Sequence, residues 1–333
     1  MTRLRILVPF GLATVVGLAV LVGPLATSGT TVSAATTVTS ATTTAPAAAP
    51  TTFDQYALEL VNSMRANPQA AANAWLGGNL NEGLAAGTLS TSPKQPLAFN
   101  ADLESSAQTH NNDMLTKGYF SHTGSDGSSP FARMTAAGYN WQTAGENIAA
   151  VSDNAGGVTA AITKQMMQNL FVDSNVAGRG HRINLLTSAF QAVGISNGYV
   201  SAWAPFNGLP SAATTQDFGS NGAPPVLTGV AFNGTGNGSF YAPGHAYSGV
   251  KVTVATTGAT PKTISSVLTS ASGGFAIAVP ANGCYSLTFT RAGVSLSTRV
   301  AVAASNVEVD YTPTAIVAPG GAFATDSTFT ATC

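Results

Sequence analysis

Three short motifs hold the residues best suited to chemistry, Phe120-Ser121-His122, Gly145-Glu146-Asn147-Ile148-Ala149 and Gly180-His181-Arg182-Ile183-Asn184. Two imidazoles and one carboxylate can bind a divalent metal such as zinc and leave one coordination position open. They can also transfer protons, with Glu146 orienting an imidazole, or simply cross-link the fold by hydrogen bonds. The spacing is not that of a compact metal motif, so the residues alone leave these three interpretations open.

The segment that carries these motifs has a mixed pattern of helices and strands. Apolar residues recur at helical spacing from Phe53 to Met64. Asn100 is a suitable N-cap for a second helix that stops at Gly118, and Ser129-Pro130 opens a short helix. We expect a further helix over about 158–171, a short helix from His181 to Leu186, and strands near 190–196, 199–203 and 213–218. His122 falls in a predicted loop, and Glu146 falls at the edge of the predicted core.

The C-terminal part of the chain has a different pattern. Apolar and polar residues alternate in short runs at 250–254, 274–279, 285–289, 298–302 and 307–309, separated by Gly, Pro and Asn. Alternation of this kind predicts short antiparallel strands, and their regular spacing is typical of a small β-sandwich.

The N-terminus reads as an export signal. Arg3 and Arg5 precede an apolar run, and small residues at Val32-Ser33-Ala34 suit cleavage. An uncleaved membrane anchor is the alternative, since the run approaches the length that spans a bilayer. The predicted organisation is a signal peptide (1–34), a Thr/Ala/Pro-rich linker (35–52), a mixed domain (53–219), a linker (220–226), a β-sandwich (227–311) and a tail (312–333). After cleavage we expect no transmembrane segment.

Charged residues make up only 8% of the chain, and the net charge is −1. A nucleic-acid-binding protein needs clustered Lys and Arg to displace counterions from phosphates. No such cluster occurs here, so we exclude nucleic acid as a partner.

Cys284 and Cys333 are the two cysteines of the chain. In an oxidising compartment they can form a disulfide that attaches the last residues to the preceding fold. The alternative is two unpaired thiols. Neither is expected to act as a nucleophile, because no basic residue adjoins them in sequence to lower the thiol pKa.

The mixed domain resembles the bacterial branch of the CAP superfamily, also called SCP-like extracellular proteins. Besides the three motifs above, the resemblance lies in five blocks that occur in family order over residues 53–219: Leu60-Val61-Asn62-x-x-Arg65, Pro96-Leu97-x-Phe99-Asn100-x-x-Leu103, Ala107-x-x-His110-x-x-Asp113-Met114, Phe190-x-x-Val193-Gly194-Ile195 and Thr215-Gln216-Asp217-Phe218-Gly219.

This resemblance implies an α–β–α sandwich with a surface cavity lined by two histidines and two acidic residues, which can hold zinc. His122, Glu146 and His181 match cavity positions, and His122 and His181 are the implied metal ligands. The fourth, acidic position is not filled by a Glu in this sequence, and Asp126 is the substitute that we predict. His110 is expected to be a hydrogen-bonded core histidine.

The C-terminal domain resembles prealbumin-like or carboxypeptidase-regulatory-like β-sandwiches, through Leu227-Thr228-Gly229-Val230, Gly273-Gly274-Phe275 and Asn306-Val307-x-Val309-Asp310-Tyr311. Relatives often carry acidic residues in the first loop of this domain, which can bind calcium. Here the loop at 233–239 has no carboxylate, so we predict no calcium in this domain.

The predicted fold class is α+β, a CAP-type α–β–α sandwich followed by a small all-β sandwich. We expect a secreted or extracellular bacterial protein, with the periplasm and the cell surface as alternative locations. Its cavity would bind a metal ion, lipid, envelope component or partner protein. The fold does not determine the activity, and we favour binding over catalysis because no Glu fills the fourth, acidic cavity position. The alternative is a metal-dependent or acid–base hydrolase that uses His122, Glu146 and His181.

Overall fold

The computed structural model describes residues 49–234, 240–317 and 333. The predicted signal peptide, most of the linker that follows it and most of the predicted C-terminal tail lie outside these residues. Within the described part of the chain, no helix has the length and apolar character needed to cross a membrane.

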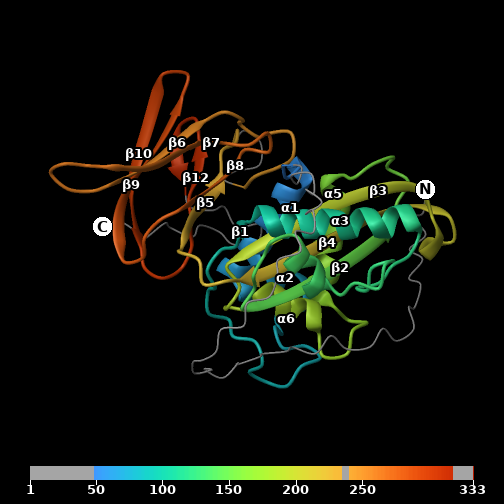
Figure 1. Cartoon of the computed structure of the whole chain (residues 1–333). Coiled ribbons are helices and arrows are strands. Elements are labelled where there is room, and N and C mark those ends of the chain that lie inside the picture. The colour runs from blue at the N-terminus through green and yellow to red at the C-terminus, as the bar shows by residue number, and fades with distance from the viewer. Residues whose placement is uncertain (1–48, 235–239, 318–332) are drawn as a thin grey trace, which may run out of the picture.

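The first half of the described chain is built around a four-stranded sheet of order β1-β3-β4-β2 (Figure 1). Its strands are β1 (Ala98–Phe99), β2 (Thr143–Ser152), β3 (Ala192–Trp203) and β4 (Leu209–Ser220). β1 pairs with β3 in parallel, and the other pairs are antiparallel.

Helices cover both faces of this sheet. They are α1 (Thr52–Ala66), α2 (Pro68–Trp75), α3 (Ala101–Lys117), α4 (Pro130–Ala136), α5 (Ala160–Val172) and α6 (Gly180–Leu186). Side chains alternate along β3: Val193 and Ile195 enter the core formed with α1 and α5, whereas Gly194 and Gly198 face α3. The result is a three-layer α–β–α arrangement, and the predicted α+β class is confirmed.

Local sequence signals account for the ends of several helices. The Asn100 side chain accepts from the backbone N–H groups of Asp102 and Leu103 at the start of α3, and Gly118 ends that helix with a φ of 72°. The Ser129 hydroxyl accepts from Ala132 at the start of α4, where Pro130 occupies the first turn.

The rest of the described chain is all β. One sheet has the order β10-β9-β6-β7 and a second has the order β11-β5-β8, while β12 and β13 form a separate pair. The bounds are β5 (Val226–Val230), β6 (Lys251–Thr256), β7 (Thr263–Leu268), β8 (Gly274–Ala278), β9 (Gly283–Arg291), β10 (Val294–Val302), β11 (Val307–Glu308), β12 (Asp310–Thr312) and β13 (Ala315–Val317). Side chains from both sheets, among them Leu227, Val252 and Phe289, share one apolar core.

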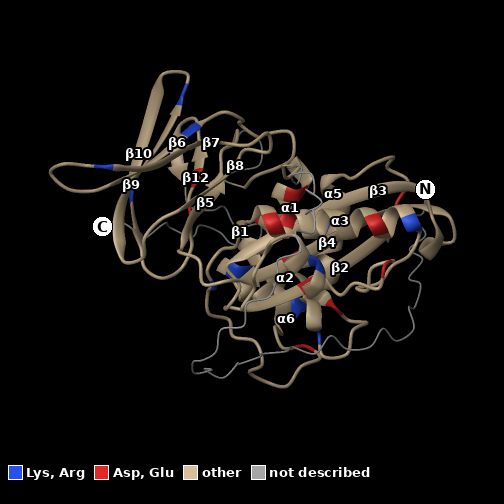
Figure 2. Cartoon of the chain, in the orientation of Figure 1, with Lys and Arg blue, Asp and Glu red and all other residues tan. Residues whose placement is uncertain are grey.

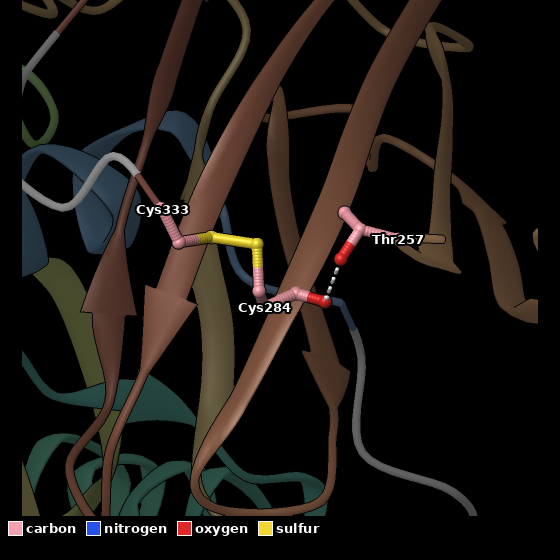
Figure 3. Close-up of a disulfide and its surroundings, with 3 residues drawn as sticks. All are labelled: Thr257, Cys284 and Cys333. Atoms are coloured by element: carbon pink, nitrogen blue, oxygen red, sulfur yellow. Dashed lines mark hydrogen bonds between the residues drawn. A yellow bond between two sulfur atoms is a disulfide. The ribbon is translucent and has the colours of Figure 1, made fainter. Parts of the chain in front are cut away.

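Cys284 on β9 and Cys333 form a disulfide, which is the first of the two alternatives that the sequence left open (Figure 3). The Cys284 carbonyl also accepts a hydrogen bond from the Thr257 hydroxyl at 3.1 Å. The bridge therefore ties the last residue of the chain to a central strand of the larger sheet.

The two halves of the described chain contact each other through polar side chains. The Asn306 amide donates to the carbonyl oxygens of Pro96 and Gln191 at 3.0 and 2.7 Å. Its own backbone N–H donates to the Gln95 side chain. In the described part of the chain, the Lys and Arg positions are spread over several separate elements (Figure 2).

Candidate functional site

The three predicted site residues come from three separate elements. His122 lies in the loop that follows α3, Glu146 lies on β2, and His181 is the second residue of α6. His110 on α3 is fully buried and contacts this loop. Its Nε2–H donates to the Ser121 carbonyl at 2.9 Å. His110 is thus the hydrogen-bonded core histidine predicted from the sequence, and it fixes the residue before His122.

Glu146 holds His122 through a short hydrogen bond. The Nδ1–H of His122 donates to Oε1 at 2.7 Å, and Arg133 of α4 donates through Nη2 to Oε2 at 2.6 Å. The Glu146 side chain is 2% exposed. A buried carboxylate needs partners of this kind, because burying it unpaired is costly. Glu146 therefore orients the imidazole, and both of its oxygens are occupied by protein groups.

His181 has an equivalent partner in Asp173. Its Nδ1–H donates to Asp173 Oδ1 at 2.8 Å, and its backbone N–H donates to Oδ2 at 2.9 Å. Asp173 is the C-cap of α5 and has a φ of 52°, a left-handed conformation that Asp tolerates better than most residues. The turn at the end of α5 thereby places a carboxylate against the first turn of α6.

The two imidazoles lie beside each other. Their ring centroids are 6.1 Å apart and the ring planes differ by 30°. The side chains are 25% and 18% exposed for His122 and His181, so both rings reach the surface. Each Nδ1 is held by a carboxylate, and among the described residues neither Nε2 has a protein hydrogen-bond partner. The structure thus brings the two histidines together with their free nitrogen atoms available.

The electrostatics keep His122 neutral. Burial lowers the pKa of His122 to about 4, with smaller contributions in the same direction from the neighbouring His181 and Arg133. A neutral imidazole that donates from Nδ1 carries a lone pair on Nε2, which is the form that binds a metal.

A second carboxylate, Asp217, lies opposite Glu146 in the β2–β4 register. Burial raises the pKa of Glu146 to about 7 and the pKa of Asp217 well above its ordinary value, and the Glu146 charge raises the latter further. Arg133 and His122 both donate to Glu146, so this geometry favours an ionised Glu146 beside a protonated Asp217.

Asp126 does not join the site, so its prediction as the fourth cavity residue is wrong. It lies on an exposed turn, where its carboxylate accepts from the Ser128 backbone N–H at 2.8 Å. The acid beside the second histidine is Asp173, which sequence reasoning missed. A signal was present, because Asp173 lies only eight residues before His181, in the segment that leads to the Gly180-His181 motif. Arg133 and Asp217 were also missed as partners of Glu146.

The sequence also contains a Gly-x-Ser-x-Gly string at residues 194–198. In a hydrolase this motif forms a strained turn between a strand and a helix that exposes the serine. Here the string lies inside β3, and Ser196 is 7% exposed. A Cβ built on Gly194 would lie 2.1 Å from the Leu103 backbone of α3. The glycines therefore allow helix and sheet to pack closely, and the string is not a nucleophile turn.

A surface hollow of about 600 Å³ lies near the C-terminal end of α3. It is lined by Leu115 and Lys117 of α3 and by Gly198 and Tyr199 of β3. None of the histidines or their carboxylate partners lines it. The paired histidines and this hollow are separate features.

Comparison with known proteins identifies the first half of the chain. Residues 58–203 match the model of the CAP family, described as the cysteine-rich secretory protein family. The uncharacterized protein YkwD of Bacillus subtilis (strain 168) is 32% identical over 108 residues, which are 32% of this chain and 36% of that protein. The chain thus matches about a third of the length of this curated relative.

A solved structure is also similar, that of an extracellular protein containing a SCP domain from Bacillus anthracis str. Ames. It is 25% identical, covers 38% of this chain and 35% of its own, and has a TM-score of 0.29. His122, Glu146, Asp173 and His181 all lie within residues 58–203, and this part of the chain is a CAP domain.

Proposed function

We propose that this protein is exported and that its CAP domain binds a divalent metal ion, zinc in particular, through His122 and His181. One observation carries the proposal: each imidazole has its Nδ1 fixed by a buried carboxylate, and within the described part of the chain its Nε2 has no protein partner. Histidines that bind metals commonly have this second hydrogen bond, which sets the tautomer and orients the ring.

The donor set supports an open site. Imidazole nitrogens suit zinc, and a site with few protein ligands keeps positions for water or for a ligand. Among the described residues, the one group of three His, Cys, Asp or Glu donors within 4.8 Å of one another lies elsewhere in the molecule. The histidine pair would thus supply two protein ligands, and the remaining positions would accept an envelope component, a lipid group or a partner protein.

We favour binding over turnover. Both oxygens of Glu146 are held by His122 and Arg133, so this carboxylate does not reach a substrate. The pKa of Glu146, about 7, is the observation that favours an acid–base hydrolase instead. Turnover of a peptide, ester or glycan panel by the full chain, lost in Glu146→Gln, would establish that alternative.

Export is supported by the basic and apolar N-terminus and by the disulfide, because disulfides persist in oxidising compartments. A β-sandwich of the prealbumin-like type for residues 227–311 is also part of the proposal, supported by the two sheets that share a core. N-terminal sequencing of protein recovered from the culture medium should begin near residue 35 if the signal is cleaved as predicted.

The metal proposal is tested by titrating zinc into the EDTA-stripped full chain in a calorimeter. We expect one zinc ion per chain, with binding lost in His122→Ala and in His181→Ala. His245→Ala is the matched control, because His245 lies in the β-rich part and should leave the zinc heat unchanged. Equal zinc binding by the wild type and by both histidine variants, His122→Ala and His181→Ala, would refute the proposal.

A further inference from the structure

The loop that carries His122 is tied to α3 on both sides of this residue. On one side, the Nε2–H of His110 donates to the Ser121 carbonyl at 2.9 Å. On the other side, the Asp113 carboxylate accepts from the Ser125 backbone N–H at 2.9 Å and from the Ser125 hydroxyl at 2.7 Å. His122 therefore lies between two contacts with the same helix.

Asp113 also holds the start of the loop. Its Oδ2 accepts a short hydrogen bond from the Tyr119 hydroxyl, and that hydroxyl oxygen also accepts from the Ser125 N–H at 3.1 Å. The Tyr119 ring lies edge-on to the His110 ring, with the ring centroids 6.3 Å apart. One carboxylate thus joins the beginning of the loop to the segment beyond His122.

Both contacts start from one face of a rigid element. His110 and Asp113 are three residues apart on α3, so their side chains leave the same side of this helix. The helix itself packs against β3 and β4 of the sheet. Because loops are more mobile than the elements that carry them, the two contacts determine where the His122 backbone lies relative to the sheet. Glu146 on β2 then orients the ring.

We propose that Asp113 is a positioning residue of the metal site, which holds the loop so that the His122 imidazole lies beside that of His181. The inference rests on the proposed zinc binding by these two histidines. Asp113 acts through the loop and not as a ligand, because both of its oxygens accept hydrogen bonds from residues 119 and 125.

The consequence for zinc binding is energetic. A loop that is ordered before the metal arrives loses no conformational freedom when the metal binds. Without Asp113 the loop keeps the His110 contact but loses the three hydrogen bonds that this carboxylate accepts. Loss of a group that supports a metal ligand typically weakens metal affinity by about 10–100-fold. Asp113 does not touch His122 itself, so we expect a loss of about tenfold, at the lower end of this range.

Positioning can be separated from charge at this residue. A carboxylate also attracts a divalent cation through space, whereas the loop contacts need only polar atoms in the right places. In Asp113→Asn the amide oxygen can accept from the Tyr119 hydroxyl and the Ser125 N–H, and the amide nitrogen can donate to the Ser125 hydroxyl oxygen. Asp113→Asn therefore removes the charge and keeps the contacts, whereas Asp113→Ala removes both.

The test is zinc calorimetry on the EDTA-stripped full chain, together with amide hydrogen exchange of the metal-free chain. We expect Asp113→Ala to raise the zinc Kd about tenfold and to speed exchange of the Ser125 N–H. Asp113→Asn should stay close to the wild type in both measurements. Asn112→Ala is the matched control, because Asn112 is the exposed neighbour of Asp113 on α3 and should change neither.

Two outcomes would overturn the inference. One is a folded Asp113→Ala chain that binds zinc as tightly as the wild type. The other is an Asp113→Asn chain that binds zinc as weakly as Asp113→Ala, because charge alone would then explain the loss.

Two further measurements keep the inference testable. If Asp113→Ala does not fold by far-UV circular dichroism, Ser125→Ala replaces it. This variant keeps the Asp113 charge and removes one loop contact, so its zinc Kd should rise, and an unchanged Kd would refute the positioning role. If the wild type binds no zinc, the proposed function fails. Hydrogen exchange then decides separately whether Asp113 holds the loop, and equal Ser125 exchange in the wild type and Asp113→Ala would show that it does not.

Discussion

Replacing Asp173 with Asn removes the charge that holds His181 and keeps the shape of the side chain. Asn also tolerates the left-handed backbone of this position, where φ is 52°. The carboxylate accepts from the imidazole through Oδ1 at 2.8 Å and from the His181 backbone through Oδ2 at 2.9 Å. A carboxamide has one acceptor oxygen, so it can satisfy only one of these two donors.

Two magnitudes follow for Asp173→Asn. The loss of a hydrogen bond to a charged group destabilises a protein by about 1.5–3 kcal/mol. The loss of the group that orients a metal-binding histidine typically weakens metal affinity by about 10–100-fold. We therefore expect the zinc Kd to rise by about 10–100-fold and the urea midpoint of unfolding to fall. Far-UV circular dichroism should still show a folded chain.

Asp126→Asn is the matched control, because Asp126 is the acid that sequence reasoning placed in the cavity. The structure places it on an exposed turn, so its zinc affinity should equal that of the wild type. Zinc calorimetry on the two variants shows whether Asp173 or Asp126 supports the zinc-binding histidines. The reasoning fails if Asp173→Asn binds zinc as tightly as the wild type, or if Asp126→Asn binds it more weakly.

Three further variants test the helix–sheet packing, a buried carboxylate and the disulfide. Gly194→Ala should lower stability by about 1–3 kcal/mol in urea unfolding, because its Cβ would meet the α3 backbone at Leu103; an unchanged midpoint would contradict the packing. Burial, followed by the Asp54 charge, raises the pKa of Glu104 from 4.5 to about 8. The folded chain then binds more protons than the unfolded chain between these pH values, so stability falls as pH rises from about 4.5 to about 8. Glu104→Gln should reduce the difference between the urea midpoints at pH 5 and pH 8.5. A difference equal to that of the wild type would contradict the raised pKa of Glu104 as its cause. Cys284→Ala with Cys333→Ala opens a loop with a sequence separation of 49, which costs at most about 4 kcal/mol in the chain-entropy model; a Tm equal to that of the oxidised wild type would show that the bridge does not stabilise the fold.

Local signals made the helix ends predictable. Asn100, Gly118 and Ser129 act on the backbone within a few residues of themselves, and each is found at the predicted end of a helix. Strands were less predictable. The sequence suggested two strands separated near Asn197-Gly198, but β3 runs through this dipeptide. Gly198 is present because of tertiary packing and not because the strand ends there: a Cβ at this position would lie 2.4 Å from Leu115 of α3.

The site was predictable only in part for a similar reason. The motifs pointed to His122, Glu146 and His181, which the structure places close together. Asp126 was chosen for its closeness to His122 in sequence, whereas Asp173 reaches His181 because the turn after α5 reverses the chain. Arg133 lies on α4 and Glu146 on β2, so the two side chains meet only in the folded state. Contacts of this kind depend on the arrangement of elements, which the sequence pattern does not encode locally.

The most direct test of the central proposal is X-ray absorption spectroscopy at the zinc edge, on full chain loaded with one equivalent of zinc. We expect two imidazole nitrogens at about 2.0–2.1 Å, with the imidazole scattering reduced in His122→Ala and in His181→Ala. A spectrum without imidazole scattering, or one that neither substitution changes, would contradict the assignment of these two histidines as the metal ligands.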